Sequence, residues 1–438
     1  MTLERLLAAL RTFPGTDWLI RQTTVRRLES YNIGCRNEME REVRTVTLAL
    51  TLYVDFNEEG KSYRGSYVME VRPGWSGEEL RKAIAEGIFA AGFVKNPRYP
   101  LVEPAGSQTE AGDRSGKERL PDLARCLADL QDAFHSVRPE SGNGRISYSE
   151  FFLTDGRVRI LNSRGVDAAY ASRTLYAETA VHVGPQDGET EIFESYGMSV
   201  EDPLRAAEIL KERLAALFAV AEQKFHAEKN RAEGKVNILL SGECLARFFG
   251  YFRTCTDAQM IYQKLSPLEP GGPVQEGGDP ITLTLEPELP GSSLSRPFDE
   301  DGLALKPRTP IRDGKFLEIC GNTRFAGYLG IAPSGAIANI HVTGGTASVE
   351  ELKKEPYLEL VSFSDFQMNP ITGDFGSEIR LGFFFDGTAT VPVTGGSISG
   401  TMAEARKGLR MSREERQYDH FLGPETVCVR GVSVGGCL

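Results

Sequence analysis

Residues 45–56 read TVTLALTLYVDF, and this stretch decides how the N-terminal part of the chain folds. Apolar side chains stand at every second position from Val46 to Phe56, and threonine, alanine, tyrosine or aspartate stands between them. A period of two predicts a half-buried β-strand, because successive side chains of a strand point to opposite faces of the sheet. The polar residues 57–60 predict a turn into a second strand and therefore a hairpin. The second strand is expected to carry Tyr63, Tyr67, Met69 and Val71.

Helices are predicted on both sides of this hairpin. Leucines at helical spacing over residues 3–10 indicate a helix before it. After it, Ser76 and Glu79 have the spacing of a capping box, and Leu80, Ile84 and Ile88 continue a helix to about residue 91. Residues 1–102 are therefore expected to form a small α+β domain.

A strand-rich and helical region is expected over residues 103–233. It begins with the polar, Gly- and Ser-rich segment 103–118, which predicts a linker or mobile loop. A helix through Leu123, Leu127 and Leu130 follows. Strands with turns at 155–156 and 162–165 are predicted next, and a long helix over 203–228 closes the region.

The sequence beyond residue 233 is typical of a β-rich domain, which we expect to span 234–438. Short strand-like runs alternate there with loops rich in Gly and Pro, including two long irregular loops at 266–280 and 286–297. The predicted fold class is therefore α+β, with a small N-terminal domain, a mixed middle region and a β-rich C-terminal domain. The strand-like runs are 236–240, 281–285, 381–385, 390–393 and 427–434.

The bulk composition indicates a globular protein of two or three domains. The 438 residues include 50 basic and 61 acidic side chains, a net charge of −11 that does not favour nucleic-acid binding. Seven cysteines without a CxxC pair fit free thiols in a reducing compartment. The first residues do not resemble a signal peptide, and no apolar run approaches the roughly 20 residues that span a bilayer. We therefore expect a cytoplasmic protein that does not insert into membranes.

The histidines argue against a self-sufficient zinc hydrolase. A zinc-binding helix needs two histidines about one turn apart, so that both imidazoles reach one ion. The chain has 5 histidines, and no two of them lie within a few turns of each other. Each is therefore interpreted as a surface or core residue. They are His135, His182, His226, His341 and His420.

Nucleophiles and phosphate-binding loops are also weakly indicated. Ser241 lacks the first glycine of a GxSxG elbow. Cys244 could be activated by a helix N-terminus, although a buried small residue is the simpler interpretation. None of the glycine pairs follows a strand and opens a helix, as a phosphate loop requires.

Five strings of the chain are distinctive in their order and spacing. One string, Asn162–Gly165, closes a predicted strand in the middle region. The others lie in the C-terminal half and are SRPFDEDG at 295–302, IRDGK at 311–315, NPITGDF at 369–375 and VRGVSVGG at 429–436. In order and spacing this set resembles the motifs of the TldD/PmbA family, also described as modulators of DNA gyrase or peptide-maturation proteases. The resemblance covers nearly the whole chain and is weak before about residue 145.

The resemblance implies a two-subunit cytoplasmic metallopeptidase. In this family the TldD-type subunit carries an H-E-x-x-x-H zinc helix after a Leu-Leu strand, and the TldE (PmbA) type lacks it. Aligning Leu239 and Leu240 places Ser241, Gly242 and Ala246 at the His, Glu and His positions. The stretch 411–424, which would supply a further cysteine ligand, has none. This chain is therefore expected to bind no zinc, and the zinc is expected in a TldD-like partner.

The family motifs also suggest residues that could contact a peptide. Turn formation or capping of backbone amides explains the same residues equally well, so both interpretations stay open. The candidates are Asn162, Ser163, Phe298, Asp299, Gly373, Asp374 and Phe375.

Three functions compete at this point. The first is a non-catalytic TldE-like subunit that binds unfolded peptide and completes a peptidase with a TldD-like partner. The second is a homodimer that holds an unfolded peptide or a client protein without hydrolysis. The third is a metal-independent hydrolase that uses Cys244 or Ser241.

Overall fold

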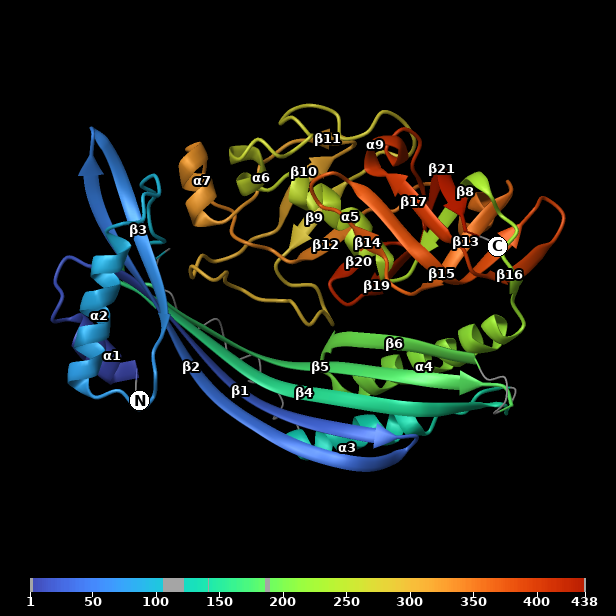
Figure 1. The fold of residues 1–438 in the computed structure, drawn as a ribbon, viewed down its shortest axis with the longest axis horizontal. Helices are drawn as coiled ribbons and strands as arrows, with labels where there is room; N and C mark the ends of the chain where they lie inside the picture. The colour runs from blue at the N-terminus through green and yellow to red at the C-terminus, as the bar shows by residue number, and fades with distance from the viewer. Residues whose placement is uncertain (1–2, 105–121, 141, 186–189, 437–438) are drawn as a thin grey trace.

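The first half of the chain is built on one long, curved antiparallel sheet (Figure 1). The structure is a computed structural model that describes residues 3–104, 122–140, 142–185 and 190–436. The strand order is β3-β2-β1-β4-β5-β6. The strands are β1 (Asp17–Ile33), β2 (Arg36–Glu58), β3 (Lys61–Glu70), β4 (Gly144–Asn162), β5 (Asp167–Val183) and β6 (Thr190–Ser199).

The predicted hairpin is confirmed as part of this sheet. Residues 45–56 lie in β2 and pair with β1 on one side and with β3 on the other. Leu48, Leu50 and Leu52 are buried under the helices α1 (Leu3–Leu10) and α2 (Gly77–Ala91). The capping box that was predicted at the start of α2 is present, with Ser76 as the N-cap.

The predicted turn at Asp155 and Gly156 is wrong, because β4 runs straight through both residues. They pair with β1 on one side and with β5 on the other, so backbone hydrogen bonds on both edges hold them in the strand. Asp155 also accepts a hydrogen bond from Arg173 of β5 at 2.6 Å. The predicted turn over 162–165 is confirmed between β4 and β5.

Two helices cover one face of this sheet. α3 (Leu123–His135) and α4 (Pro203–Phe225) pack against each other and against buried side chains of β4, β5 and β6. The C-terminal sheets lie over the opposite, concave side (Figure 1). The sheet contains strands from both regions that were expected from the sequence, β1 to β3 from residues 1–102 and β4 to β6 from residues 103–233. A domain boundary at 102/103 stays a prediction. The predicted loop at 103–118 lies mostly outside the described residues.

The second half of the chain forms two further sheets. The first has the order β11-β10-β9-β12-β20-β19, and the second has the order β13-β8-β21-β17-β15-β16-β7, with β14 beside β15 and β18 beside β21. Their strands are β7 (Glu228–Lys229), β8 (Gly234–Ser241), β9 (Leu283–Glu286), β10 (Arg308–Arg312), β11 (Lys315–Phe316), β12 (Asn339–Val342), β13 (Tyr357–Phe363), β14 (Gln367–Met368), β15 (Asp374–Phe385), β16 (Thr390–Thr394), β17 (Ser397–Thr401), β18 (Arg410–Met411), β19 (Glu415–Tyr418), β20 (Phe421–Pro424) and β21 (Thr426–Gly435).

One buried helix forms the centre of this half. α5 (Cys244–Cys255) carries Phe248, Phe249 and Phe252, which are fully buried in the largest hydrophobic cluster. Because it follows β8 after a two-residue turn, its first residues are fixed by the sheet. No helix within the described ranges is long and apolar enough to cross a membrane. The remaining helices are α6 (Ala258–Tyr262), α7 (Thr323–Leu329), α8 (Val349–Leu352) and α9 (Met402–Ala405).

Candidate functional site

A cleft of about 1370 Å³ lies between the curved sheet and the C-terminal half. Its floor consists of side chains from β4, β5 and β6, including Phe152, Tyr176 and Phe193. The opposite wall consists of the β8–α5 turn, residues 361–366 and residues 416–420. A cleft between two layers, lined by rings and by polar groups, is the usual form of a binding site.

The β8–α5 turn places the predicted degenerate metal site in this cleft. Ser241, Gly242 and Ala246 all line it. Gly242 has a φ of +84°, in the left-handed region that favours glycine. The side chains at these positions are a hydroxyl-bearing serine, a glycine hydrogen and an alanine methyl group. None of them is an imidazole or a carboxylate, so these positions do not fit a zinc ion. In the part of the chain that the structure describes, no group of three or more His, Cys, Asp or Glu side chains could hold a metal.

An arginine joins the two walls of the cleft. Arg213 of α4 binds Glu194 of β6 at 2.8 Å and Glu243, the residue after Gly242, at 2.6 Å. Its guanidinium lies over the rings of Tyr196 and Tyr418, 5.1 and 5.7 Å from their centroids. Burial raises the pKa of Glu194 to about 7, even though Arg213 opposes the shift. This carboxyl group can therefore gain or lose a proton near neutral pH.

Cys244 is poorly suited to be a nucleophile. It is buried, and its thiol donates to the carbonyl oxygen of Ser241 at 3.3 Å. Burial raises the pKa of this thiol to about 12, so the reactive thiolate is scarce at neutral pH. The hypothesis of a cysteine hydrolase therefore loses its support from helix activation.

A second polar group lines the cleft at the β19–β20 turn. Asp419 has a φ of 44° and accepts hydrogen bonds from the backbone N–H of Ser293 at 2.7 Å and from its hydroxyl at 2.8 Å. The His420 ring lies 3.5 Å from the same carboxylate. The serine hydroxyl donates to a carboxylate and not to the imidazole, so this group is not arranged as a nucleophile and base. It fixes the turn that carries Tyr418.

Sequence reasoning missed the groups around Arg213 and Asp419. Glu194, Arg213 and Glu243 come from three elements, and nothing in their local sequence marks them. Arg213 stands in an ordinary amphipathic helix, and Glu194 stands in a strand with alternating polarity. Only Glu243 lies in a string that the family comparison singled out.

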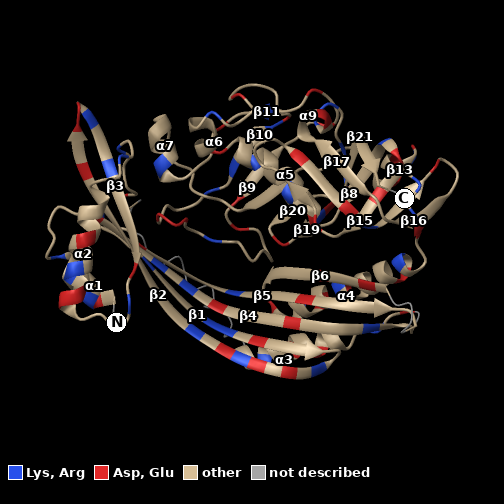
Figure 2. Cartoon of the chain, in the orientation of Figure 1, with Lys and Arg blue, Asp and Glu red and all other residues tan. Residues whose placement is uncertain are grey.

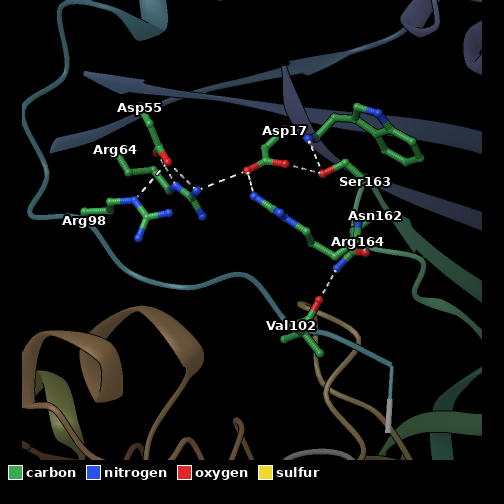
Figure 3. A network of polar contacts seen from close by, with 9 residues as sticks. Asp17, Asp55, Arg64, Arg98, Val102, Asn162, Ser163 and Arg164 are labelled. Atoms are coloured by element: carbon green, nitrogen blue, oxygen red, sulfur yellow. Dashed lines mark hydrogen bonds and ion pairs between the residues drawn. The ribbon is translucent and has the colours of Figure 1, made fainter. Parts of the chain in front are cut away.

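The turn at Asn162 and Ser163 belongs to a polar network outside the cleft (Figure 3). The Asn162 side chain donates to the carbonyl of Val102 at 2.8 Å and accepts from the backbone N–H of Val166 at 3.0 Å. The Ser163 hydroxyl donates to Asp17 at 2.8 Å. Both side chains hold β1, β4 and the segment before residue 104 together, which is the turn interpretation.

Phe298 and Asp299 also make structural contacts. Phe298 is buried with Val102 and Val166. The Asp299 carboxylate accepts from the backbone N–H groups of Asp301 at 3.0 Å and Leu303 at 2.9 Å. Burial raises the pKa of Asp299 to about 6, and the nearby Asp301 adds to the shift. These are the contacts of a capped turn.

The third motif, Gly373–Phe375, closes the loop between β14 and β15. Gly373 has a φ of +76°, and a Cβ there would approach the Tyr251 ring to 3.0 Å. The Asp374 carboxylate accepts from the Thr372 hydroxyl at 2.6 Å, and Phe375 packs in the core. None of the seven predicted motif residues is among those that line the cleft. A role for them in peptide binding stays a prediction.

The chain thus has a large cleft with Ser241, Gly242 and Ala246 in its wall. The family model of the PmbA/TldA metallopeptidase C-terminal domain matches residues 233–436. Residues 233–436 therefore form a C-terminal domain of the PmbA/TldA metallopeptidase type, and the resemblance to the TldD/PmbA family that was drawn from the motifs is confirmed there. No curated protein sequence matches the chain.

Solved structures share the fold along the whole chain. TldE from Thermococcus kodakarensis superposes with a TM-score of 0.75 at 16% identity and covers 99% of both chains. A protein of Thermotoga maritima described as a candidate modulator of a DNA gyrase gives 0.74 at 16% identity, again with 99% of both chains covered. A similarly described protein of Bacteroides thetaiotaomicron gives 0.72 at 19% identity, covering 99% of this chain and 97% of the other. At these identities the likeness concerns the fold alone.

Proposed function

We propose that this chain is the non-catalytic, TldE-like subunit of a two-subunit metallopeptidase, and that it holds unfolded peptide while a TldD-like partner supplies zinc. The observation that carries the proposal is the cleft wall at Ser241, Gly242 and Ala246. These residues stand where an H-E-x-x-x-H helix would present its ligands, and they line a cleft that is large enough for several residues of a peptide. The chain keeps the chamber of a peptidase and lacks groups that could lower the pKa of a metal-bound water.

The edge of the curved sheet supports the binding of extended peptide. β6 is the last strand of its sheet, and residues 192–195 and 197 of this strand line the cleft. An edge strand presents backbone N–H and C=O groups to which an extended peptide can add as a further strand. Main-chain pairing requires little of the peptide sequence, which suits a subunit that handles unfolded chains.

The cellular setting of the proposal is the cytoplasm. The six cysteines that the structure describes are free thiols, and five of them are buried. Reduced thiols are typical of a compartment with a low redox potential.

Reconstitution with a partner tests the proposal. The chain is purified alone and together with a TldD-like chain of the same genome, and zinc and the cleavage of a fluorogenic unfolded peptide are measured. We expect neither zinc nor cleavage from the chain alone, and cleavage from the mixture. The matched control is a partner in which the glutamate of its H-E-x-x-x-H helix is replaced by glutamine, which should be inactive in the same complex.

Two outcomes would contradict the proposal in different ways. About one equivalent of zinc in the isolated chain, prepared without chelator, would show that the chain has its own metal site. A stable homodimer that binds peptide and does not associate with any TldD-like chain would favour the client-holding homodimer instead. Light scattering on the purified chain distinguishes this second outcome.

A further inference from the structure

We propose that the floor of the cleft extends into a site for a basic side chain, lysine or arginine, of the bound peptide, formed by Glu150, Glu178 and the neighbouring aromatic rings. This inference rests on the proposed peptide-holding function and adds the chemical class of the peptide. The site lies on the concave face of the curved sheet, where β4 and β5 run side by side.

Two carboxylates face each other beside this floor, one cross-strand pair beyond Phe152 and Tyr176, without a cation between them. Glu150 of β4 and Glu178 of β5 are direct cross-strand partners, so their side chains lie on the same face of the sheet. Like charges directly opposite in an antiparallel pair destabilise it. Within the described ranges no Lys, Arg or His forms an ion pair with either carboxylate, and the Tyr176 hydroxyl donates to Glu178 at 2.9 Å. Burial, with a further contribution from Glu178, raises the pKa of Glu150.

Elsewhere on the same face of the sheet, the carboxylate of Glu29 is neutralised by arginines. Glu29 of β1 lies opposite Phe152 and is bound by Arg27 at 2.8 Å and by Arg41 at 2.7 Å. Blue and red bands alternate along β1 and β2 (Figure 2). The two unpaired carboxylates are thus a local feature of β4 and β5 and not a general property of the sheet.

Aromatic rings complete the site. Phe152 and Tyr176 are the next cross-strand pair on this face, with ring centroids 5.9 Å apart. Tyr176 and Phe193 keep 45% and 44% of their surface exposed, so both rings are accessible to a ligand. The Arg27 guanidinium already lies over the Phe152 ring, 6.0 Å from its centroid. A cation from a ligand can therefore be held between a ring and the carboxylates.

Charge complementarity selects a basic peptide as the occupant. An acidic segment would be repelled by two carboxylates, and a neutral one would leave them unpaired. A metal ion would need further ligands, and the described residues offer no third His, Cys, Asp or Glu beside this pair. A long aliphatic stem can cover Tyr176 and Phe193 while its charged end reaches the carboxylates, which is how lysine and arginine side chains pack.

Two labelled peptides of equal length, which differ only in lysine against glutamine, test the inference by fluorescence anisotropy at low salt. We expect the wild-type chain to prefer the lysine peptide. The double variant E150Q/E178Q should bind the lysine peptide about fivefold to tenfold more weakly and the glutamine peptide unchanged. The control is Glu70→Gln, which removes an exposed carboxylate at the end of β3 and should change neither affinity.

A third variant guards against misfolding. Glu178→Lys places a cation opposite Glu150, so it should suppress the preference for lysine while the midpoint of urea unfolding stays the same or rises. Equal affinity of the wild type for both peptides would overturn the inference and leave the proposed peptide-holding function in place. Absence of binding to either peptide would contradict the proposed function itself.

Discussion

Two arginines of this molecule have nearly the same neighbours, with opposite consequences for the carboxylates they bind. Arg64 of β3 and Arg213 of α4 each lie over two tyrosine rings and bind two acidic side chains. The partners of Arg64 are Asp17, Asp55, Tyr53 and Tyr99, and those of Arg213 are Glu194, Glu243, Tyr196 and Tyr418.

The difference lies first in burial, which raises the pKa of Glu194, and then in how many cations each network contains. Around Arg64, two further arginines, Arg98 and Arg164, bind the same two aspartates (Figure 3). The Arg64 guanidinium therefore holds the pKa of Asp55 below its usual value. Arg213 forms ion pairs with two glutamates, Glu194 and Glu243, which come from the two walls of the cleft. The Arg64 network lies on one sheet, where the fixed register of neighbouring strands places several charged side chains close together. The Arg213 network lies where two layers meet, so it contains only the charged side chains that each layer has at that junction. We infer that the first network is structural and that the second can respond to its surroundings.

The largest expected effect is the loss of Arg64. Arg64→Met removes a side chain that is only 1% exposed and leaves Asp17 and Asp55 without their central partner. Breaking a buried ion pair in this way costs about 3 kcal/mol of folding free energy. Urea unfolding followed by circular dichroism measures it. A loss below about 1 kcal/mol would show that Arg98 and Arg164 suffice, and the distinction between the networks would fail.

A smaller loss is expected from Arg213→Met, about 2 kcal/mol, because Glu243 is 48% exposed and can be solvated by water. The variant should also bind unfolded peptide differently, since the two walls of the cleft lose their common contact. Arg64→Met should leave peptide affinity unchanged as long as the chain is folded. Anisotropy with the same peptides compares them, and equal effects of both variants on binding would contradict the assignment of roles.

The pH dependence of stability should have opposite signs in the two networks. Glu194 ionises near pH 4.5 when unfolded and only at about 7 when folded, so its favourable contribution is complete below pH 4.5 and is lost as the pH rises toward 7. The folding stability of Glu194→Gln relative to the wild type should therefore rise as the pH rises over that interval, by an amount on the order of 1 kcal/mol. Asp55, whose folded pKa is lowered from 3.8, stabilises above that pH and loses its contribution as the pH falls below it. Melting temperatures of Glu194→Gln and Asp55→Asn between pH 3 and 8 provide the test.

The smallest effect is expected at the edge of the Arg64 network. Ser163→Ala removes the hydroxyl that binds Asp17 and should cost about 1 kcal/mol. Because Ser163 lies outside the cleft, peptide affinity should stay the same. A clear loss of peptide affinity in this folded variant would restore the peptide-contacting role that the family motif suggested.

Local periodicity and local capping could be predicted from the sequence with good success. The strand at 45–56, the capping box at Ser76 and the long helix α4 follow from spacing within a few residues, because hydrogen bonds and side-chain direction have the same short period. The first long strand, β1, was not predicted. Its side chains mix charge and aromatic character, and it is held by two neighbouring strands and not by its own pattern.

The sequence by itself determined that the expected zinc-ligand positions hold Ser241, Gly242 and Ala246, because ligand chemistry depends on residue type at a fixed spacing along one strand and helix. Tertiary structure decided what surrounds them. It brought Arg213, Glu194 and Glu243 to one point and set Glu150 opposite Glu178 beside the cleft floor. Those pairings arise from strand register and from the packing of layers, and no local pattern encodes them, since the residues that meet are separated by 19 to 49 positions of intervening chain.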